Sequence, residues 1–378
     1  MKARSVRPAS VVHVVENLER GGLERVVIEL VRAQRALGMR CRVVCLFGRG
    51  ALADELAADG VDVSACGKRR GPDMRALRRL RAQLRHEPGA VLHTHNAVAH
   101  YYAVLAAIGL PLRQVVNTRH AMPTTGGIGR REWLYRQAMR LTDVCVAVCE
   151  AARRQLQAHG VRPRKGLVAI PNGIRLERYR PASDASRRQL AEVLGLPRGT
   201  VLVGSVGRLN RVKDQASLIR AFGRVHQAMP ATALLLIGDG PEREALAEVA
   251  HGEGVYPAVH FMGDRGDVDV LLQGLDLFVM SSVSEGYSIA LLEASAAGLP
   301  IVATDVGGNG EIVRNAISGR LVPASDPVAL AEAMLSILDD RELAGRMGSA
   351  GRAWVLECGS FRSMAERYAA VYAGMVFA

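Results

Sequence analysis

Short apolar runs alternate along the chain with longer segments in which apolar residues recur at helical spacing. The first half contains seven such runs, from SVVHVV to GLVAI, with the length and β-branched content of buried strands. Amphipathic segments such as LERVVIELVRAQRAL separate most of these runs. The alternation is typical of βαβ units, so it predicts an α/β domain with a parallel, doubly wound sheet.

The alternation stops at residues 170–184, where a Pro/Asn/Gly turn leads into a polar stretch, and then restarts with six further runs. We therefore predict a first domain over 1–170, a linker over 171–185, and a second Rossmann-like domain that begins at residue 186. Ligands of doubly wound sheets bind beside the carboxyl ends of the strands. A cleft between the two domains is the expected site.

Composition supports two domains and a globular protein. The chain has 378 residues, of which 49% are hydrophobic and 23% charged. Its longest apolar run, AVLAAIGLPL, is far shorter than the roughly 20 residues that span a bilayer. The first apolar stretch is short and ends at Glu16, which argues against a secretory signal. We expect a cytoplasmic protein.

The net charge of +12 is unevenly distributed. Residues 1–175 hold 30 Lys and Arg against 13 Asp and Glu, whereas residues 176–378 hold 19 against 24. Basic amphipathic segments at 68–88 and 130–140 favour contact with an anionic membrane as much as solvated helix faces. Nucleic acid is not expected as a partner, because aromatic residues make up only 4% of the chain and offer few stacking platforms.

Three metal or nucleotide signals are interpreted as structural. The six cysteines include the pairs in CRVVC and CVAVC, but both lie in strand-like runs and no second ligand pair follows. Asp267 and Asp269 form a D-x-D string at the start of a helix, where acidic residues favour the helix dipole. VATDVGGNGEIV lacks the G-x-G-x-x-G pattern of a first βα turn. No metal or cofactor is predicted.

Two loops carry features suited to a diphosphate. Gly21 and Gly22 follow the first strand, where they permit a tight turn and a helix N-terminus that presents free N–H groups. Arg208 and Lys213 follow the first strand of the second domain, and Lys213 is the only lysine of residues 176–378. Two cations on one loop can stabilise the charge that develops on a departing diphosphate.

The stretch SEGYSIALLEASAAG places two carboxylates, Glu285 and Glu293, around a predicted helix start. Ser288 is a suitable N-cap, and the main-chain amides of Gly286, Tyr287 and Ser288 can bind an anion. Glu293 lies on an apolar helix face, so it should be paired or bound to a ligand. Among the histidines, which are expected to be mostly structural, His120 closes a strand as a cleft residue would.

Taken together, these segments resemble family 4 of the nucleotide-sugar-dependent glycosyltransferases, which are retaining enzymes with the GT-B fold. The resemblance covers the chain nearly end to end. The chain is similar in particular to bacterial sugar transferases of exopolysaccharide and lipid-linked glycan assembly. The most specific part of the resemblance is the E-x7-E block formed by Glu285 and Glu293, together with the GLPIVATDVGG sequence that follows it. The motifs that carry it are GGLERVV, PNGI, VGRLNRVKD, IGDGPER, SEGYSIALLEASAAGLPIVATDVGGNGEIV and SGRLVPASDP.

The resemblance implies roles for these residues. Arg208 and Lys213 would hold the donor diphosphate, Glu285 the transferred sugar, and Glu293 the ribose. The resemblance also assigns the phosphates to the amides of 286–288 and to Gly21 and Gly22, and the base to the loop at Gly263, Asp264 and Arg265. His120 would lie near the transferred sugar. The second domain would end at residue 358, and a C-terminal helix in 359–378 would cross back to the first domain.

The chain departs from the family pattern in two places. Many members have Phe-Gly where this chain has Tyr287-Ser288, and an acidic residue where it has Arg175. The first change alters the loop near the donor, and the second affects contacts of the linker.

The function implied is metal-independent transfer, with retention, of a hexose or hexosamine from a UDP-sugar or GDP-sugar. The acceptor would be a glycan or lipid-linked saccharide of cell-surface polysaccharide synthesis, reached from the inner face of the plasma membrane. Two alternatives remain at this stage. One is another GT-B enzyme, such as a nucleotide-sugar epimerase or a phosphorylase, and the other is a non-catalytic basic module that binds membrane or nucleic acid.

Overall fold

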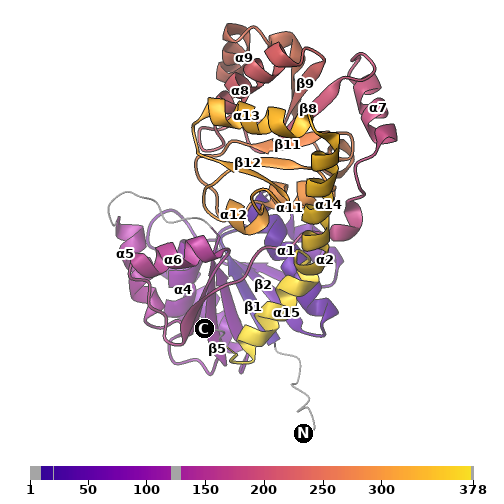
Figure 1. The fold of residues 1–378 in the computed structure, drawn as a ribbon. Helices are drawn as coiled ribbons and strands as arrows, with labels where there is room; N and C mark the ends of the chain where they lie inside the picture. The colour runs from indigo at the N-terminus through magenta and orange to yellow at the C-terminus, as the bar shows by residue number, and fades with distance from the viewer. Residues whose placement is uncertain (1–9, 20, 121–128, 376–378) are drawn as a thin grey trace. The chain divides into compact units, whose positions relative to one another are not determined.

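The computed structural model describes residues 10–19, 21–120 and 129–375. The chain divides into two compact units. Unit 1 comprises Met1–Gly173 and Phe361–Ala378, and unit 2 comprises Ile174–Ser360. The ribbon in Figure 1 shows both units and labels many of their helices and strands.

Within its described residues, unit 1 contains a seven-stranded parallel sheet with the order β3-β2-β1-β4-β5-β6-β7. The order reverses direction beside β1, which is the mark of a doubly wound sheet. The strands are β1 (Ser10–Val15), β2 (Arg40–Cys45), β3 (Asp62–Ala65), β4 (Val91–His95), β5 (Gln114–Arg119), β6 (Val144–Ala147) and β7 (Gly166–Ala169).

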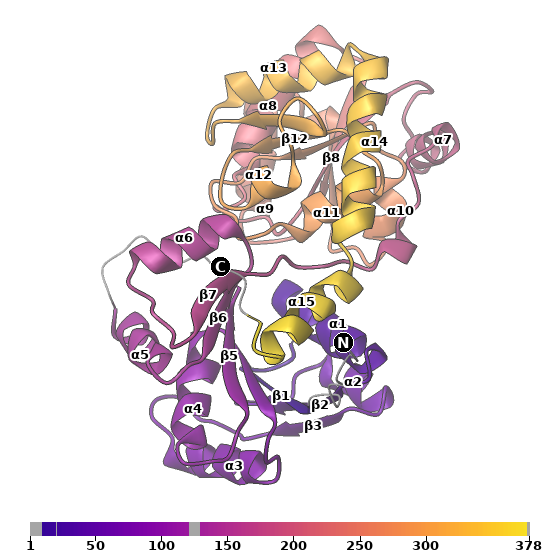
Figure 2. The same ribbon diagram turned by 60° about the horizontal axis from the view of Figure 1, so that its bottom comes forward.

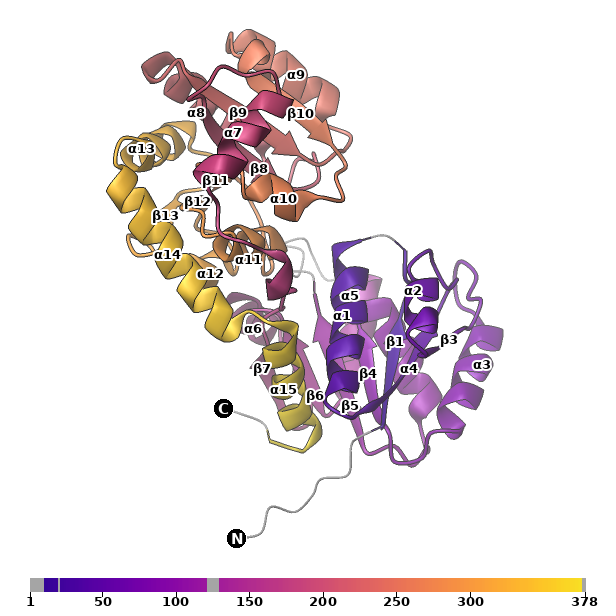
Figure 3. The ribbon, with the colours of Figure 1, turned by 90° about the vertical axis from the view of Figure 1, so that its right-hand side faces the viewer.

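Helices cover both faces of this sheet. Helices α3 and α4 bury leucine, alanine and tyrosine side chains on one face, whereas α1 and α2 pack on the other. Helix α15, although last in sequence, belongs to unit 1 and packs against α1 (Figure 3). The helices of unit 1 are α1 (Gly22–Ala36), α2 (Ala53–Ala58), α3 (Met74–Arg85), α4 (Ala97–Ala107), α5 (Arg130–Met139), α6 (Glu150–Ala158) and α15 (Phe361–Tyr372).

Unit 2, which is described throughout, repeats the arrangement with a six-stranded parallel sheet of order β10-β9-β8-β11-β12-β13. Its core is a continuous cluster of aliphatic side chains between the sheet and helices α8, α9 and α13. The strands are β8 (Val201–Val206), β9 (Thr232–Ile237), β10 (Val259–Gly263), β11 (Leu277–Met280), β12 (Ile301–Thr304) and β13 (Gly319–Val322).

The long helix α14 of unit 2 packs against α11, and α13 packs against α8 (Figure 2). The helices of unit 2 are α7 (Asp184–Val193), α8 (Gln215–Ala228), α9 (Arg243–Gly252), α10 (Val268–Leu272), α11 (Ile289–Ala296), α12 (Asn309–Ile312), α13 (Pro327–Leu338) and α14 (Arg341–Cys358), with single 3-10 turns at Leu176–Arg178 and Tyr256–Ala258. The predicted pair of doubly wound α/β domains is confirmed, and each apolar run expected to be a strand contributes one.

All six cysteines lie in described segments and are free thiols. Burial raises the pKa of Cys41 and Cys45 to about 12, and that of Cys66 and Cys145 to about 11. Such thiols stay protonated and behave as small core residues, as the sequence pattern indicated.

Candidate active site

The loops that follow the strands of unit 2 gather the predicted donor-binding residues at one edge of its sheet. Arg208 and Lys213 follow β8, Asp264 and Arg265 follow β10, and residues 285–288 follow β11. Because every strand of this sheet is parallel, these loops share the carboxyl edge, where ligands of doubly wound sheets bind.

Lys213 and Glu285 form the centre of this edge. The Lys213 Nζ lies 2.5 Å from Glu285 Oε1, and the Ser282 hydroxyl donates a hydrogen bond of 2.6 Å to the same oxygen. The exposed fraction of the side chain is 24% for Lys213 and 10% for Glu285. Both groups on Glu285 use Oε1, and the described residues supply no hydrogen-bond partner for Oε2. That oxygen is free to accept a ligand hydroxyl.

Arg208 is exposed, and its side chain has no hydrogen-bond or ionic partner among the described residues. Its loop is held by close backbone contacts instead. A Cβ added to Gly238 would lie 2.2 Å from the Gly207 carbonyl oxygen, and one added to Gly240 would lie 2.2 Å from that of Leu209. The GDG turn after β9 therefore supports the loop that carries both cations.

Glu285 is positioned by a contact that the sequence analysis missed. Gly307 has φ +55°, and a Cβ there would lie 1.8 Å from the Glu285 carbonyl oxygen. Its neighbour Gly308 donates a main-chain hydrogen bond of 2.9 Å to the Gly286 carbonyl. The glycine pair of VATDVGGNGEIV therefore serves to bring the β12 loop against the 285–288 turn. Its position directly after a strand was the signal available in the sequence.

The turn itself matches the predicted helix start. Helix α11 begins at Ile289, and the Ser288 hydroxyl accepts a hydrogen bond of 3.4 Å from the Leu291 amide. Tyr287 is buried, with 7% of its surface exposed. A large side chain therefore fills the core side of the loop at the position where this chain departs from the family pattern.

Glu293 is paired, as its place on an apolar helix face required. The Tyr179 hydroxyl donates a hydrogen bond of 2.6 Å to Glu293 Oε1. Burial raises the pKa of Glu293 to about 7, although the hydrogen bond from Tyr179 and the charge of Arg178 act in the opposite direction. Arg178 in turn binds Asp269 at 3.0 Å. Tyr179 and Arg178 lie in the predicted linker, so the sequence analysis gave them no role.

The remaining unit 2 candidates are more exposed. Among the described residues, Asp264 has no hydrogen-bond or ionic partner, while Arg265 forms an ion pair of 2.6 Å with Asp267. The latter contact and the Asp269–Arg178 pair occupy both carboxylates of the D-x-D string. Both acidic residues therefore form ion pairs within unit 2.

In unit 1, Gly21 and Gly22 form the N-terminus of α1. Gly21 is extended, with φ −169°, and Gly22 is the first helical residue, so neither needs the left-handed conformation. The main chain bends at Gly21 and enters the helix at Gly22, as the two glycines permit. A Cβ on Gly22 would meet nothing within 4 Å, which leaves open space beside the helix N-terminus.

His120 follows β5 and belongs to a cluster of imidazoles that the sequence analysis treated separately. His13 on β1 pairs in register with His93 on β4, and His95 lies two residues further on the same face. His95 Nδ1 lies 3.1 Å from His120 Nε2. Burial lowers the pKa of His120 to about 3, so its ring is neutral at physiological pH.

The described residues contain one group of three histidines, His13, His93 and His95, whose nitrogens lie within 4.8 Å of one another. Every one of these ring nitrogens has a hydrogen-bond partner. The partners of His93 are the Thr118 hydroxyl at 2.8 Å and the Tyr372 hydroxyl at 2.7 Å. Hydrogen bonding therefore accounts for the arrangement of these rings.

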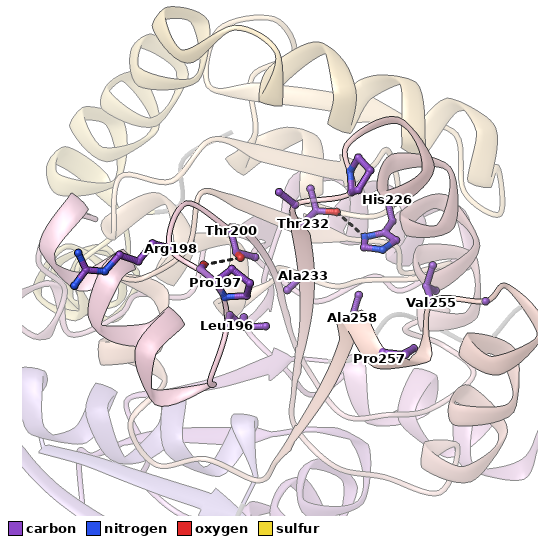
Figure 4. Close-up of a pocket in the computed structure, with 13 residues that line it drawn as sticks. Leu196, Pro197, Arg198, Thr200, His226, Thr232, Ala233, Val255, Pro257 and Ala258 are labelled. Carbon is purple, nitrogen blue, oxygen red and sulfur yellow. Dashed lines mark hydrogen bonds between the residues drawn. The ribbon is translucent and has the colours of Figure 1, made fainter.

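Unit 2 also has a pocket of about 300 Å³ at the opposite edge of its sheet, where β8 and β9 begin (Figure 4). Leu196, Pro197 and Thr200 line it from the chain before β8, and His226 and Thr232 line it from α8 and β9. Because it lies at the amino ends of the strands, it is separate from the loops that carry the candidate site.

Comparisons with known proteins agree with this arrangement. The family model described as "Glycosyltransferase Family 4" matches residues 20–178, and that described as "Glycosyl transferases group 1" matches residues 186–354. The chain is 32% identical over 296 residues to the GDP-mannose-dependent alpha-(1-6)-phosphatidylinositol monomannoside mannosyltransferase of Mycolicibacterium smegmatis. That alignment covers 72% of this chain and 74% of the relative.

A second relative is the N-acetyl-alpha-D-glucosaminyl L-malate synthase of Bacillus anthracis, which is 28% identical over 75% of this chain and 74% of its own length. Among solved structures, HepE from Anabaena in complex with UDP has a TM-score of 0.86 at 20% identity and covers 97% of this chain and 100% of its own. The last comparison supports the GT-B fold. The family models and the mannosyltransferase, together with that fold, show that the chain belongs to glycosyltransferase family 4 and is a glycosyltransferase.

Proposed function

We propose that the protein transfers a hexose or hexosamine from a nucleotide diphosphate sugar to a glycan or lipid-linked acceptor, with retention and without a metal. The observation that carries this proposal is the group of Lys213, Ser282 and Glu285 at the carboxyl edge of unit 2. It combines a cation for a leaving diphosphate with a carboxylate oxygen open to sugar hydroxyls. The mannosyltransferase and the UDP-bound HepE, by their names, support a nucleotide sugar as donor.

The proposed roles follow the chemistry of each group. As the bond between the anomeric carbon and the diphosphate breaks, positive charge develops on the sugar ring and negative charge on the departing phosphate. Lys213 and the unpaired Arg208 stabilise that phosphate. Glu285 Oε2 accepts hydroxyl hydrogen bonds from the sugar, and Glu293 binds the ribose. The amides of 286–288 and the open N-terminus of α1 at Gly21 and Gly22 provide further phosphate donors, and Asp264 and Arg265 contact the base.

A panel of UDP-sugars and GDP-sugars, with lipid extract from a bacterial membrane as acceptor, tests the activity. We expect transfer from one donor, unchanged by EDTA, and a product whose anomeric configuration by NMR equals that of the donor. Inversion would refute retention, and loss of activity with EDTA would refute metal independence. Absence of transfer, together with no thermal stabilisation by any nucleotide diphosphate, would refute the proposal itself.

We further propose that unit 1 binds the anionic inner face of the plasma membrane, where a lipid-linked acceptor is found. Within the described residues, no helix has both the length and the apolar character to cross a bilayer. Helix α3 instead exposes arginines beside Met74, which is 62% exposed. Helix α4 packs against α3, and its Leu105 is 53% exposed. Ile108, the first residue after α4, is 55% exposed. Cations around exposed apolar side chains suit a lipid surface.

Co-sedimentation with vesicles of phosphatidylglycerol and phosphatidylcholine tests this surface. A triple variant of exposed α3 arginines, Arg75→Gln, Arg78→Gln and Arg85→Gln, should bind roughly a hundredfold more weakly, at about 1 kcal/mol per basic residue. The matched control replaces three exposed unit 2 arginines: Arg188→Gln, Arg224→Gln and Arg346→Gln. Equal losses in the two triple variants, or binding that does not weaken as salt rises, would refute the proposal.

A further inference from the structure

A chain of three imidazoles leads from His120 into the core of unit 1 and ends on an amide. His120 Nε2 lies 3.1 Å from His95 Nδ1, and His95 Nε2 lies 3.1 Å from His13 Nδ1. His13 Nε2 then lies 2.8 Å from Gln34 Oε1, on helix α1. His13, His95 and Gln34 are buried, with at most 1% of their surface exposed. Water therefore has no access to these three side chains.

The direction of this chain is set at Gln34. Its amide nitrogen donates a hydrogen bond of 3.0 Å to the Tyr372 hydroxyl, and its oxygen receives the Cys41 thiol at 3.5 Å. Burial raises the pKa of Cys41 to about 12, so the group is a thiol and acts as a donor. The thiol donates to the amide oxygen, so this contact orients that oxygen toward His13, and the Tyr372 hydroxyl then accepts from the amide nitrogen.

The protonated nitrogen of every ring follows from that oxygen. An amide oxygen only accepts hydrogen bonds, so His13 Nε2 carries a proton and donates it. Desolvation lowers the pKa of His13 to about 4, so this ring is neutral and its Nδ1 accepts. His95 must then donate from Nε2 and accept at Nδ1, and burial likewise lowers its pKa well below the usual value. By the same step, His120 donates from Nε2.

This chain of donors leaves His120 Nδ1 without a proton. In the described part of the chain, that nitrogen has no hydrogen-bond partner. An imidazole in this tautomer presents a lone pair to a ligand, whereas the opposite tautomer would present an N–H. The two forms select opposite partners, because the first accepts a hydrogen bond from a hydroxyl and the second donates one.

The Tyr372 branch is consistent with this direction. Its hydroxyl accepts from Gln34, and its own hydrogen is available to donate to His93 Nδ1 at 2.7 Å. His93 then carries its proton on Nε2 and donates it to the Thr118 hydroxyl at 2.8 Å. One orientation of the Gln34 amide thus satisfies both branches. In neither branch does a donor face a donor or an acceptor face an acceptor.

We propose that Gln34, His13 and His95 are positioning residues that hold His120 in the Nε2–H tautomer, so that Nδ1 accepts a hydrogen bond from a hydroxyl of the transferred sugar. The tautomer is a property of unit 1 alone. Its use by the sugar rests on the proposed function. Gln34 acts from three hydrogen bonds away and contacts neither His120 nor the ligand.

Nitrogen NMR of the full chain, with ¹⁵N-labelled histidine and no substrate, reads the tautomers directly. In the wild-type protein we expect His13, His95 and His120 each to show a protonated Nε2 and an unprotonated Nδ1. Gln34→Met keeps a similar volume but removes the accepting oxygen, so His120 should show a mixture of both tautomers. His100→Gln is the control, because His100 is equally buried but bonds to Thr94 and Thr142 outside the chain.

Kinetics separate positioning from general damage. We expect Gln34→Met to lower kcat roughly tenfold, which corresponds to about 1.4 kcal/mol. In a His120→Ala background the same substitution should have no further effect, because its route to the substrate is gone. An equal loss in both backgrounds, or a protonated Nδ1 on wild-type His120, would overturn the inference. If the wild-type protein transfers no sugar, the proposed function fails, and the nitrogen spectra alone decide the tautomer.

Discussion

The two units share a topology but fill the same edge of it with different chemistry. Each has a central strand from which the sheet extends in both directions, β1 in unit 1 and β8 in unit 2. Unit 1 gathers neutral imidazoles that are hydrogen-bonded to one another and to neighbouring amide and hydroxyl groups. Unit 2 gathers an ion pair at Glu285 and a carboxyl at Glu293 whose pKa is raised by burial. The shared fold therefore places loops at the same edge of each sheet. The side chains on those loops determine whether the edge carries neutral polar groups or ionised ones.

The largest expected effect tests whether the folding stability of unit 1 depends on the side chains that α15 adds to its polar core. Tyr368 is fully buried and its hydroxyl lies 2.8 Å from Thr118 Oγ1. Tyr368→Ala should destabilise unit 1 by about 3–5 kcal/mol, because it opens a large cavity. Hydrogen exchange should show lost protection in β1, β4 and α1, with unit 2 unchanged. The control, Arg362→Ala, removes a side chain that is 79% exposed on the same helix. Equal loss of protection in unit 2 would contradict the prediction.

A somewhat smaller effect tests whether unit 2 uses its charge for catalysis. Lys213→Ala should lower kcat by about 10²–10³, or roughly 3–4 kcal/mol, as for loss of one donor to a developing anion. Arg211→Ala is the matched control, because its side chain is 91% exposed and lies on the same loop. If steady-state turnover of Lys213→Ala stays within threefold of the control, the ion pair serves stability and the contrast between the units is lost.

The smallest effect concerns Glu293. Its folded-state pKa of about 7 lies above the ordinary value of 4.5, so folding favours the protonated form. The stability of unit 2 should therefore fall as pH rises from 4.5 to 7, by on the order of 1–3 kcal/mol at about 1.4 kcal/mol per pKa unit. Thermal unfolding between pH 4.5 and 8, compared with Glu293→Gln, measures this. If the melting temperature of the wild-type protein changes with pH in the same way as that of Glu293→Gln, the pKa of Glu293 is not raised by folding.

The strands and the caps could be predicted from sequence because they depend on local patterns. Apolar runs of strand length, the Ser288 cap and the need for a partner at Glu293 are all visible within about ten residues. The partner itself was not predictable, because Tyr179 lies 114 residues away in a segment without periodicity. The same reason hides the link between His13 and His95, which are 82 residues apart. The sequence analysis considered Gly307 only as part of a glycine-rich motif. Its role is a close approach to the Glu285 main chain, which is visible only in the folded structure.

The placement of α15 also bears on synthesis. Every residue of unit 2, Ile174–Ser360, leaves the ribosome before Phe361–Tyr372 does. Unit 1 meanwhile lacks the tyrosine partner of Gln34 and His93, because Tyr372 lies on α15. The half of the protein that is made first should thus reach its native state last, and a nascent chain stalled before residue 361 should expose that unfinished core to chaperones and proteases.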